Sequence, residues 1–195
     1  MPRAAAWRAY NPAARAAVAA LPLARAQVRV LGLDPGSRTT GFGVIDAGGA
    51  APRYLASGAI RTGSGDFASR LHAIHAGVAA LMAEYRPTEV AIERVFVSRN
   101  AESALKLGQA RGAALCATFG GEATLYEYSA REVKLAVVGS GAAEKRQVQR
   151  MVRALLLLEG VLGADAADAL AIALCHAHGR ATRRAIAAAT PPGAA

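Results

Sequence analysis

Cysteine, aromatic residues and acidic residues are all scarce in this chain of 195 residues. The two cysteines, Cys116 and Cys175, lie in alanine- and leucine-rich segments that favour helix, and no Cys/His spacing typical of a metal site is present. We therefore interpret both as small buried thiols rather than as a disulfide or metal ligands. Such cysteine usage fits a reducing, cytoplasmic setting.

The sequence also lacks an uninterrupted apolar run of about 18 residues, so no membrane span is expected. It is nevertheless 53% hydrophobic and 19% charged, a composition that can bury the core of one globular domain. Basic residues outnumber acids by 23 to 14, and the net charge of +9 indicates an anionic partner, either nucleic acid or an acidic membrane surface.

Composition divides the chain into three parts. Residues 1–27 contain four arginines and no acid, and we expect them to form a disordered N-terminal extension. An organellar transit peptide has a similar composition and remains an alternative. We expect residues 28–180 to form the folded domain and the Ala/Pro-rich residues 181–195 to form a flexible C-terminal tail.

Hydrophobic periodicity and turn residues predict the order of the elements in the folded domain. Short apolar runs bounded by Gly and Pro predict strands, and apolar residues at helical spacing predict amphipathic helices. The expected order is three strands, a helix, a strand, a helix, a strand and three helices, which indicates an α/β fold with a mixed five-stranded sheet flanked by helices. The strands are predicted at Val28–Asp34, Thr40–Ala47, Tyr54–Thr62, Glu89–Glu93 and Ala123–Tyr128, and the helices at Phe67–Tyr85, Ala101–Phe119, Ala130–Val137, Glu144–Leu158 and Asp165–His178.

Four acids stand at the ends of these elements, and each has an ordinary explanation. Asp34 begins an Asp-Pro-Gly turn, in which its side chain can bond nearby backbone N–H groups. Glu93 can be a polar residue where a strand meets solvent. Asp165 and Asp168 can be an N-cap and a first-turn acid of the last helix.

Taken together, the four acids favour a metal site. Asp34 and Glu93 end strands that can be neighbours, and Asp165 and Asp168 share one face of a helix because they are three residues apart. Carboxylates that converge on one place repel each other unless cations neutralise them. Oxygen ligands favour Mg²⁺, with Mn²⁺ as a substitute, and two such ions can catalyse phosphodiester hydrolysis. We therefore predict a two-metal nuclease.

The same segments resemble a known family, the RuvC Holliday-junction resolvases (crossover junction endodeoxyribonucleases). The resemblance covers Val28 to His178 in family order and spacing. It is carried by Leu31–Asp46 (LGLDPGSRTTGFGVID), Ala91–Phe96 (AIERVF), Asn100–Gly112 (NAESALKLGQARG), Gly141–Gln149 (GAAEKRQVQ) and Asp165–Leu170 (DAADAL).

The resemblance implies a ribonuclease H-like nuclease domain in residues 28–180 that acts as a homodimer on four-way junction DNA in recombination and repair. It implies paired symmetric nicks that leave 5′-phosphate and 3′-hydroxyl ends. The four acids are then catalytic residues and ligands of two Mg²⁺ ions per site. It further implies a bacterial cytoplasmic protein, associated with the nucleoid while acting, that works with a branch-migration motor of the RuvA and RuvB type.

The resemblance and the charge pattern together suggest residues that bind DNA. Phe96 matches the family's aromatic residue that stacks on a base near the branch point, and we favour this role over the alternative of a core aromatic that closes the strand. Lys134 and Lys145 match family positions associated with DNA binding or catalysis. Arg146 lies in the same basic stretch, and Arg38 follows Asp34 in an expected loop, so both are candidate phosphate contacts.

Two other functions remain as alternatives. An RNA-processing nuclease of the same fold would use the same acids, and an actin-like ATP-binding protein has a similar Asp-Pro-Gly loop but needs two related domains. The four histidines, His72, His75, His176 and His178, are expected to be surface or packed side chains. The preferred cleavage sequence and the dimer interface cannot be read from this pattern.

Overall fold

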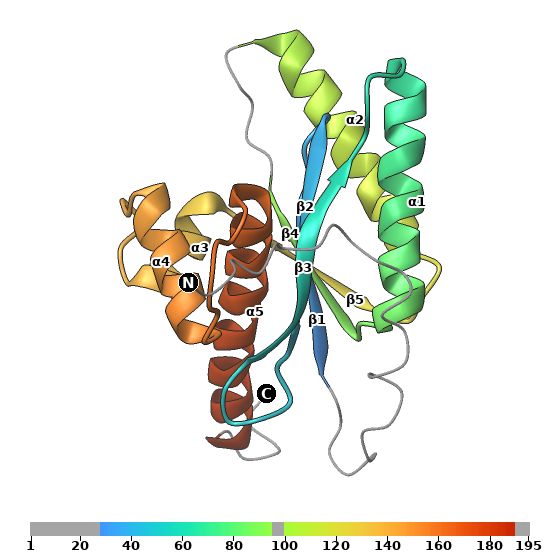
Figure 1. Ribbon diagram of the computed structural model, residues 1–195. Coiled ribbons are helices and arrows are strands. Elements are labelled where there is room, and N and C mark those ends of the chain that lie inside the picture. The colour runs from blue at the N-terminus through green and yellow to red at the C-terminus, as the bar shows by residue number, and fades with distance from the viewer. Residues whose placement is uncertain (1–27, 95–99, 190–195) are drawn as a thin grey trace, which may run out of the picture.

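The computed structural model describes residues 28–94 and 100–189 of the chain, and these residues form a five-stranded mixed sheet with helices on both faces (Figure 1). The strand order is β3-β2-β1-β4-β5. The first three strands are antiparallel, whereas β4 is parallel to both β1 and β5. The strands are β1 (Arg29–Asp34), β2 (Thr39–Asp46), β3 (Arg53–Arg61), β4 (Glu89–Glu93) and β5 (Thr124–Tyr128).

Five helices cover the two faces of this sheet. Two of them lie together on one face, and the other three lie on the opposite face (Figure 1). The first pair is α1 (Phe67–Tyr85) and α2 (Ala101–Thr118), and the second group is α3 (Ala130–Val138), α4 (Lys145–Leu155) and α5 (Ala164–Ala189). Within the part of the chain that the structure describes, no helix is long and apolar enough to cross a membrane.

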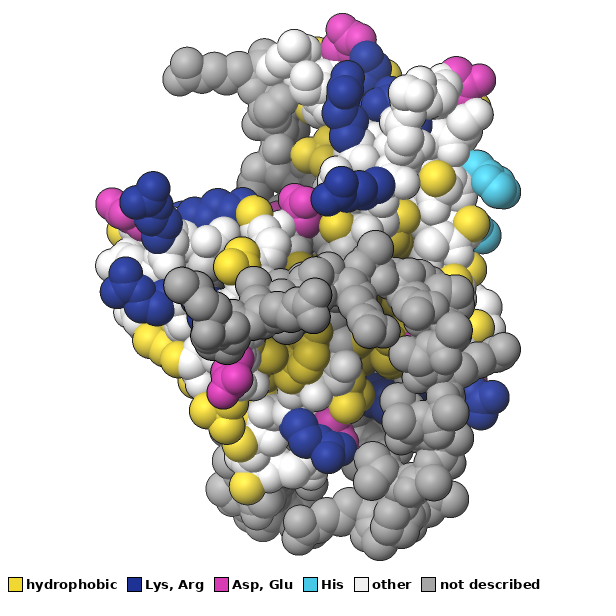
Figure 2. Space-filling model, viewed as in Figure 1, with side chains coloured by type: hydrophobic (Ala, Val, Ile, Leu, Met, Phe, Trp, Pro, Cys, Tyr) yellow, Lys and Arg dark blue, Asp and Glu magenta, His cyan; other side chains and the backbone are white. Residues whose placement is uncertain are grey.

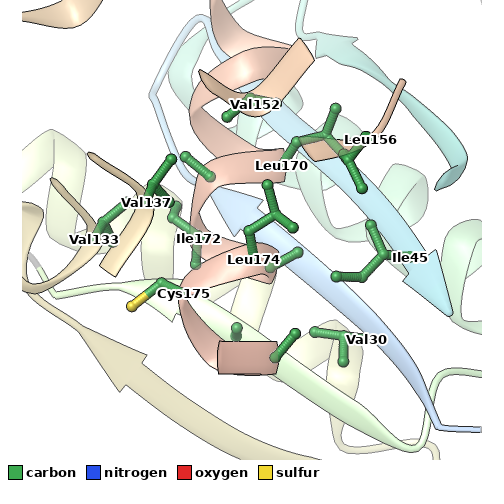
Figure 3. Close-up of a cluster of buried hydrophobic side chains, with 14 of the residues drawn as sticks. Val30, Ile45, Val133, Val137, Val152, Leu156, Leu170, Ile172, Leu174 and Cys175 are labelled. Atoms are coloured by element: carbon green, nitrogen blue, oxygen red, sulfur yellow. The ribbon is translucent and has the colours of Figure 1, made fainter. Parts of the chain in front are cut away.

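Successive side chains along a strand point to opposite faces of the sheet, so the strands contribute to two separate hydrophobic cores. On the α5 side, Val30 and Ile45 of the sheet pack against Leu170 and Leu174 (Figure 3). On the other side, Leu31 and its neighbours pack against α1 and α2. The sheet is therefore buried on both faces, and only the ends of the strands are available for chemistry.

Glycines in the first two strands allow α5 to lie directly on the sheet. A Cβ atom on Gly32 would stand 2.2 Å from the carbonyl oxygen of Ala169, and one on Gly41 would stand 2.1 Å from the carbonyl oxygen of Asp165. Neither distance can be accommodated without moving the helix, because the atom in contact is backbone. The absence of side chains at these two positions therefore sets how closely the first turns of α5 approach β1 and β2.

The described strands and helices and their order agree with the sequence-based predictions, with three differences. The helix α4 was predicted to end at Leu158 but ends at Leu155. The last helix was predicted to end at His178 but continues to Ala189. Cys116 was predicted to be a buried thiol, and this is wrong: it is exposed on α2, whereas Cys175 is buried. The predictions for residues 1–27 lie outside the described residues.

Candidate active site

Asp34 and Glu93 end two neighbouring parallel strands, and their carboxyl groups meet at one edge of the sheet. β1 pairs with β4 so that Leu33 stands opposite Ile92, which makes the two acids the next residues along their strands. Both side chains are half-buried, and the charge of Glu93 acts on the Asp34 carboxyl group. Two carboxyl groups that end neighbouring strands and are partly shielded from water oppose each other's ionisation.

The surroundings of this pair oppose ionisation. Burial first, and then the charges of Glu93 and Asp168, raise the pKa of Asp34 to about 7, although the Lys145 ammonium acts in the opposite direction. Burial and the charge of Asp168 also raise the pKa of Glu93, and the opposing effects of Asp34 and Lys145 do not cancel this. Acids with such pKa values are common at functional sites.

Asp168 joins these two acids from the first turns of α5. The Lys145 ammonium, at the start of α4, forms an ion pair with the Asp168 carboxylate. This hydrogen bond is the main reason why the pKa of Lys145 is raised, and the charges of Asp34 and Asp165 act in the same direction. One lysine therefore supplies positive charge to a group of carboxylates from three separate elements.

Asp165 stands apart from the other three acids. It is exposed in the first turn of α5 and is not among the residues that line the cleft described next. Its charge still acts on Lys145. The predicted set of four is thus brought to one end of the sheet, with Asp34, Glu93 and Asp168 inside the cleft and Asp165 outside it.

A cleft of about 230 Å³ contains the three inner acids. Its apolar lining residues come from α3, α4 and α5, and its polar lining residues are two lysines and the three acids. The lining residues are Asp34, Glu93, Asp168, Lys134, Lys145, Ala130, Val133, Val148, Ala171 and Ile172.

Two observations bear on metal binding in this cleft. Among the described residues, no three Asp, Glu, His or Cys side chains are grouped closely enough to hold an ion as they stand. The chemistry of the donors nevertheless fits Mg²⁺, because the cleft offers carboxylate oxygens alone. Burial and the neighbouring carboxylates raise the pKa values of Asp34 and Glu93 despite the Lys145 ammonium, and a bound cation would favour the ionised form of both acids.

Of the predicted DNA-binding residues that the structure describes, Lys134 and Lys145 line the cleft. Arg146 is exposed in the first turn of α4 beside Lys145. Arg38 is exposed in the loop between β1 and β2, where its backbone carbonyl accepts hydrogen bonds from Thr62. Figure 2 shows basic side chains gathered over the side of the molecule that α3 and α4 form. Phe96 lies outside the described residues.

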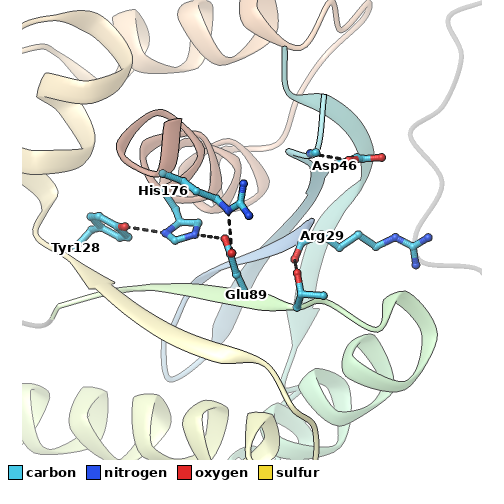
Figure 4. A network of polar contacts seen from close by, with 8 residues as sticks. Arg29, Asp46, Glu89, Tyr128 and His176 are labelled. Carbon is cyan, nitrogen blue, oxygen red and sulfur yellow. Dashed lines mark hydrogen bonds and ion pairs between the residues drawn. The ribbon is translucent and has the colours of Figure 1, made fainter. Parts of the chain in front are cut away.

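A buried polar network that the sequence did not reveal lies farther along α5. His176 is fully buried, and its ring bonds the Tyr128 hydroxyl at 2.7 Å and the Glu89 carboxylate at 2.5 Å (Figure 4). Arg180 donates to the same carboxylate at 2.8 Å. The sequence held one indication of this network. Glu89 and Glu93 are four residues apart on β4, so their side chains point to the same face of the sheet.

A second group, which was not predicted from the sequence, contacts the backbone of Glu93 from the other face of the sheet. Arg111 of α2 donates to the backbone carbonyl oxygen of Glu93 at 3.1 Å and to the Glu127 carboxylate at 2.5 Å. In the sequence, Arg111 is one basic residue of a helix, and nothing in its spacing indicates these partners.

His72 and His75 are exposed on α1, and the ring of His178 contacts the backbone carbonyl oxygen of Ala136 at 3.1 Å. None of the three lines the cleft.

Comparison with known proteins identifies the family of the chain. The family model described as crossover junction endodeoxyribonuclease RuvC matches residues 30–176. The crossover junction endodeoxyribonuclease RuvC of Marinobacter nauticus is 58% identical over 149 residues, which cover 76% of this chain and 85% of that protein. That of Burkholderia multivorans is 55% identical over 152 residues, which cover 78% and 84% respectively.

Solved structures give the same result. Thermus thermophilus RuvC in complex with Holliday junction substrate is 38% identical, with a TM-score of 0.75, and the match covers 80% of this chain and 96% of that one. The yeast mitochondrial Holliday junction resolvase is 14% identical with a TM-score of 0.62, over 82% and 83% of the two chains, and so shares the fold. Because the family model covers residues 30–176 and the Marinobacter and Burkholderia relatives are more than half identical over most of their length, the chain belongs to the RuvC family of crossover junction endodeoxyribonucleases.

Proposed function

We propose that this protein resolves four-way DNA junctions by cutting two strands of like polarity at symmetric positions, through Mg²⁺-dependent hydrolysis that leaves 5′-phosphate and 3′-hydroxyl ends. The observation that carries the proposal is the convergence of Asp34, Glu93 and Asp168 in one cleft beside Lys145. The family supplies the substrate: the related Thermus thermophilus protein has been seen with a Holliday junction.

Each acid has a distinct part in the proposed site. Asp34, Glu93 and Asp168, together with Asp165 just outside the cleft in the first turn of α5, would hold two Mg²⁺ ions. When bound, these ions activate a water molecule and stabilise the leaving oxygen of the phosphodiester. The pKa of about 7 for Asp34 means that its carboxyl holds a proton readily in the free enzyme, and binding of a cation requires that proton to leave.

Lysines and arginines position the DNA strand. Lys145 is bound to Asp168 in the free protein and is therefore placed to contact the phosphate group being cut. Lys134 lies in the same cleft, and Arg146 and Arg38 extend the positive surface outside it. Phe96, which precedes Asn100, the N-cap of α2, by four residues in the sequence, is proposed to stack on a base at the branch point.

Several finer features of the proposal come from the family alone. These are action as a homodimer, which would place one site at each of the two cut strands, cooperation with a RuvA- and RuvB-type motor, and a bacterial cytoplasmic setting. The dimer is directly measurable, because light scattering of the purified protein gives its mass in solution.

The decisive experiment compares three substrates of matched length: a four-way junction, a linear DNA duplex and a DNA–RNA hybrid. Each is incubated with Mg²⁺ and with chelator. We expect paired nicks in the junction alone, only with the metal, and ligation of the products without prior treatment because the ends are 5′-phosphate and 3′-hydroxyl.

Other outcomes would identify the alternatives. Preferential cutting of the hybrid would indicate the RNA-processing nuclease. ATP binding without any cutting would indicate the actin-like alternative. Junction cutting that persists in chelator would contradict the metal-dependent part of the proposal while leaving the substrate in place.

A further inference from the structure

Arg111 reaches Glu93 from the face of the sheet opposite the cleft. It belongs to α2, which packs with α1, whereas the cleft is built with α3, α4 and α5. Its side chain is 19% exposed, and its Nε atom donates to the Glu93 carbonyl oxygen at 3.1 Å. Its Nη2 atom donates to Glu127 Oε1 at 2.5 Å. One guanidinium therefore joins a helix to the ends of two strands.

The backbone at Glu93 needs this donor because the sheet ends there. On one side of β4, the neighbouring strand β1 ends at Asp34 and continues into Pro35, which has no N–H group to extend the ladder. On the other side, the Arg94 N–H donates to the Tyr128 carbonyl oxygen at 2.7 Å, so the last hydrogen bond between β4 and β5 is made by Arg94 and not by the Glu93 carbonyl. The Arg111 side chain provides the Glu93 carbonyl with a donor from within the protein.

The planar shape of the guanidinium suits two acceptors in different directions. Nε and Nη2 point to the Glu93 carbonyl and to the Glu127 carboxylate at the same time. A second arginine strengthens the arrangement, since Arg94 donates to the Glu127 carbonyl oxygen at 3.4 Å and stands 4.0 Å from its carboxylate. Lysine has a single ammonium on a flexible stem and cannot reproduce both bonds.

We propose that Arg111 is a positioning residue of the nuclease: it fixes the backbone that carries Glu93 and so sets where the Glu93 carboxyl group stands relative to Asp34. Arg111 does not line the cleft and acts through Glu93. The inference rests on the proposed function, because Glu93 matters to catalysis only if this cleft is the nuclease site.

Four variants of the full chain test this role: Arg111→Ala, Arg111→Lys, Glu127→Gln and, as a matched control, Lys106→Ala. Lys106 forms an exposed ion pair with Glu102 one to two turns before Arg111 on the same helix, so its loss removes a comparable ion pair without touching Glu93. For each variant we would measure junction cleavage against Mg²⁺ concentration, junction binding in chelator, Mn²⁺ binding by electron paramagnetic resonance, and the melting temperature.

Arg111→Ala is expected to lower kcat about tenfold, the scale of one charge-assisted hydrogen bond. It should also weaken Mn²⁺ binding several-fold and leave junction affinity in chelator unchanged. Arg111→Lys should recover part of the loss. Glu127→Gln should have a smaller effect, because the bond from Arg111 to the Glu93 carbonyl remains. Lys106→Ala should behave as the unmodified protein in all four measurements.

Other results of these measurements would lead to different conclusions about Arg111. A loss of junction affinity in chelator, with normal Mn²⁺ binding, would show that Arg111 contacts DNA instead. If Arg111→Ala lowers the melting temperature but leaves kcat and Mn²⁺ binding unchanged at temperatures well below melting, Arg111 has only a structural role. Failure of the unmodified protein to cut junctions would overturn the proposed function itself, whereas normal cutting by both Arg111 variants would overturn this inference alone.

Discussion

Asp34 stands at the end of β1 with two other carboxyl groups and one ammonium around it, and this environment decides what its removal should do. An amide in its place cannot ionise and is a poorer ligand for Mg²⁺, but it removes an acid from a crowded group. The fold should therefore tolerate a neutral side chain at this position well.

Asp34→Asn is expected to abolish junction cleavage in Mg²⁺ while junction binding stays within about twofold, because the basic surface is unchanged. Stability should stay equal or rise slightly, since a half-buried acid is lost. Cleavage assays, gel-shift binding and thermal unfolding check this, with Glu159→Gln in the exposed loop after α4 as the control. Cleavage at the normal rate would contradict the catalytic role of Asp34.

The four acids were predictable from sequence as a group, but their arrangement was not. Asp34 and Glu93 follow from the rule that neighbouring parallel strands end at one edge of a sheet. The inward place of Asp168 and the outward place of Asp165 depend on how α5 is rotated about its axis, and that rotation is set by contacts across the fold. Arg111 was missed for the same reason, because its partners are 16 and 18 residues away on other elements.

Among the elements, α5 determines whether the site exists, since it carries two of the four acids. Its place on the sheet is fixed at one end by the close approach to Gly32 and Gly41, and at the other by the contacts of His176 and Arg180 with Glu89. The glycines of the first two strands were visible in the sequence, but their purpose became clear only when the helix was seen against them. The extension of α5 to Ala189 was not predicted because alanines dominate its last residues. Hydrophobic periodicity therefore indicates no distinct apolar face there.

Gly41→Ala tests the close contact at the start of α5. Its Cβ atom would meet backbone of Asp165, so the helix must shift, and we expect destabilisation by about 1–3 kcal/mol together with loss of cleavage. Gly108→Ala on α2 is the matched control, because a Cβ atom there meets nothing within 4 Å and alanine favours helix by up to about 1 kcal/mol. Chemical denaturation of both variants provides the comparison, and equal stability of the two would contradict the packing argument.

Glu89 makes the attachment of α5 sensitive to acid. Burial alone would raise the pKa of its carboxyl, but the hydrogen bonds from His176 and Arg180 outweigh it and hold the pKa below the usual 4.5. Because the folded-state pKa is the lower one, these contacts stabilise the fold fully above the unfolded value. Their contribution is lost as the pH falls through the folded-state pKa.

We therefore expect the free energy of unfolding to decrease below about pH 4.5 and to do so less steeply in Glu89→Gln. Denaturant unfolding at a series of pH values from 7 down to 3 measures both slopes. Identical slopes for the two proteins would mean that Glu89 does not contribute to the acid response.

The whole molecule is basic, and its charge is unevenly spread. Of the nine net positive charges, four come from arginines in the first 27 residues, and many of the others lie around α3 and α4 beside the cleft (Figure 2). Composition alone identified an anionic partner, and the position of the charge next to the acids favours nucleic acid over a membrane surface.

Junction binding should weaken steeply as salt rises, because each phosphate contact releases counterions. Removing one contact, in Arg146→Ala, should reduce the slope of log affinity against log salt by about 1. Affinities measured in chelator between about 50 and 200 mM salt test this. A flat dependence would indicate that contacts other than phosphate neutralisation dominate binding.

The position of α5 after every strand has one more consequence, for the safety of the cell's own DNA. A fragment that ends before α5 contains Asp34 and Glu93 but neither Asp165 nor Asp168, and it also lacks the helix that covers that face of the sheet. If the proposed nuclease site is correct, an incompletely synthesised or proteolytically clipped chain should not cut DNA, because the complete set of acids is assembled only when α5 joins the fold.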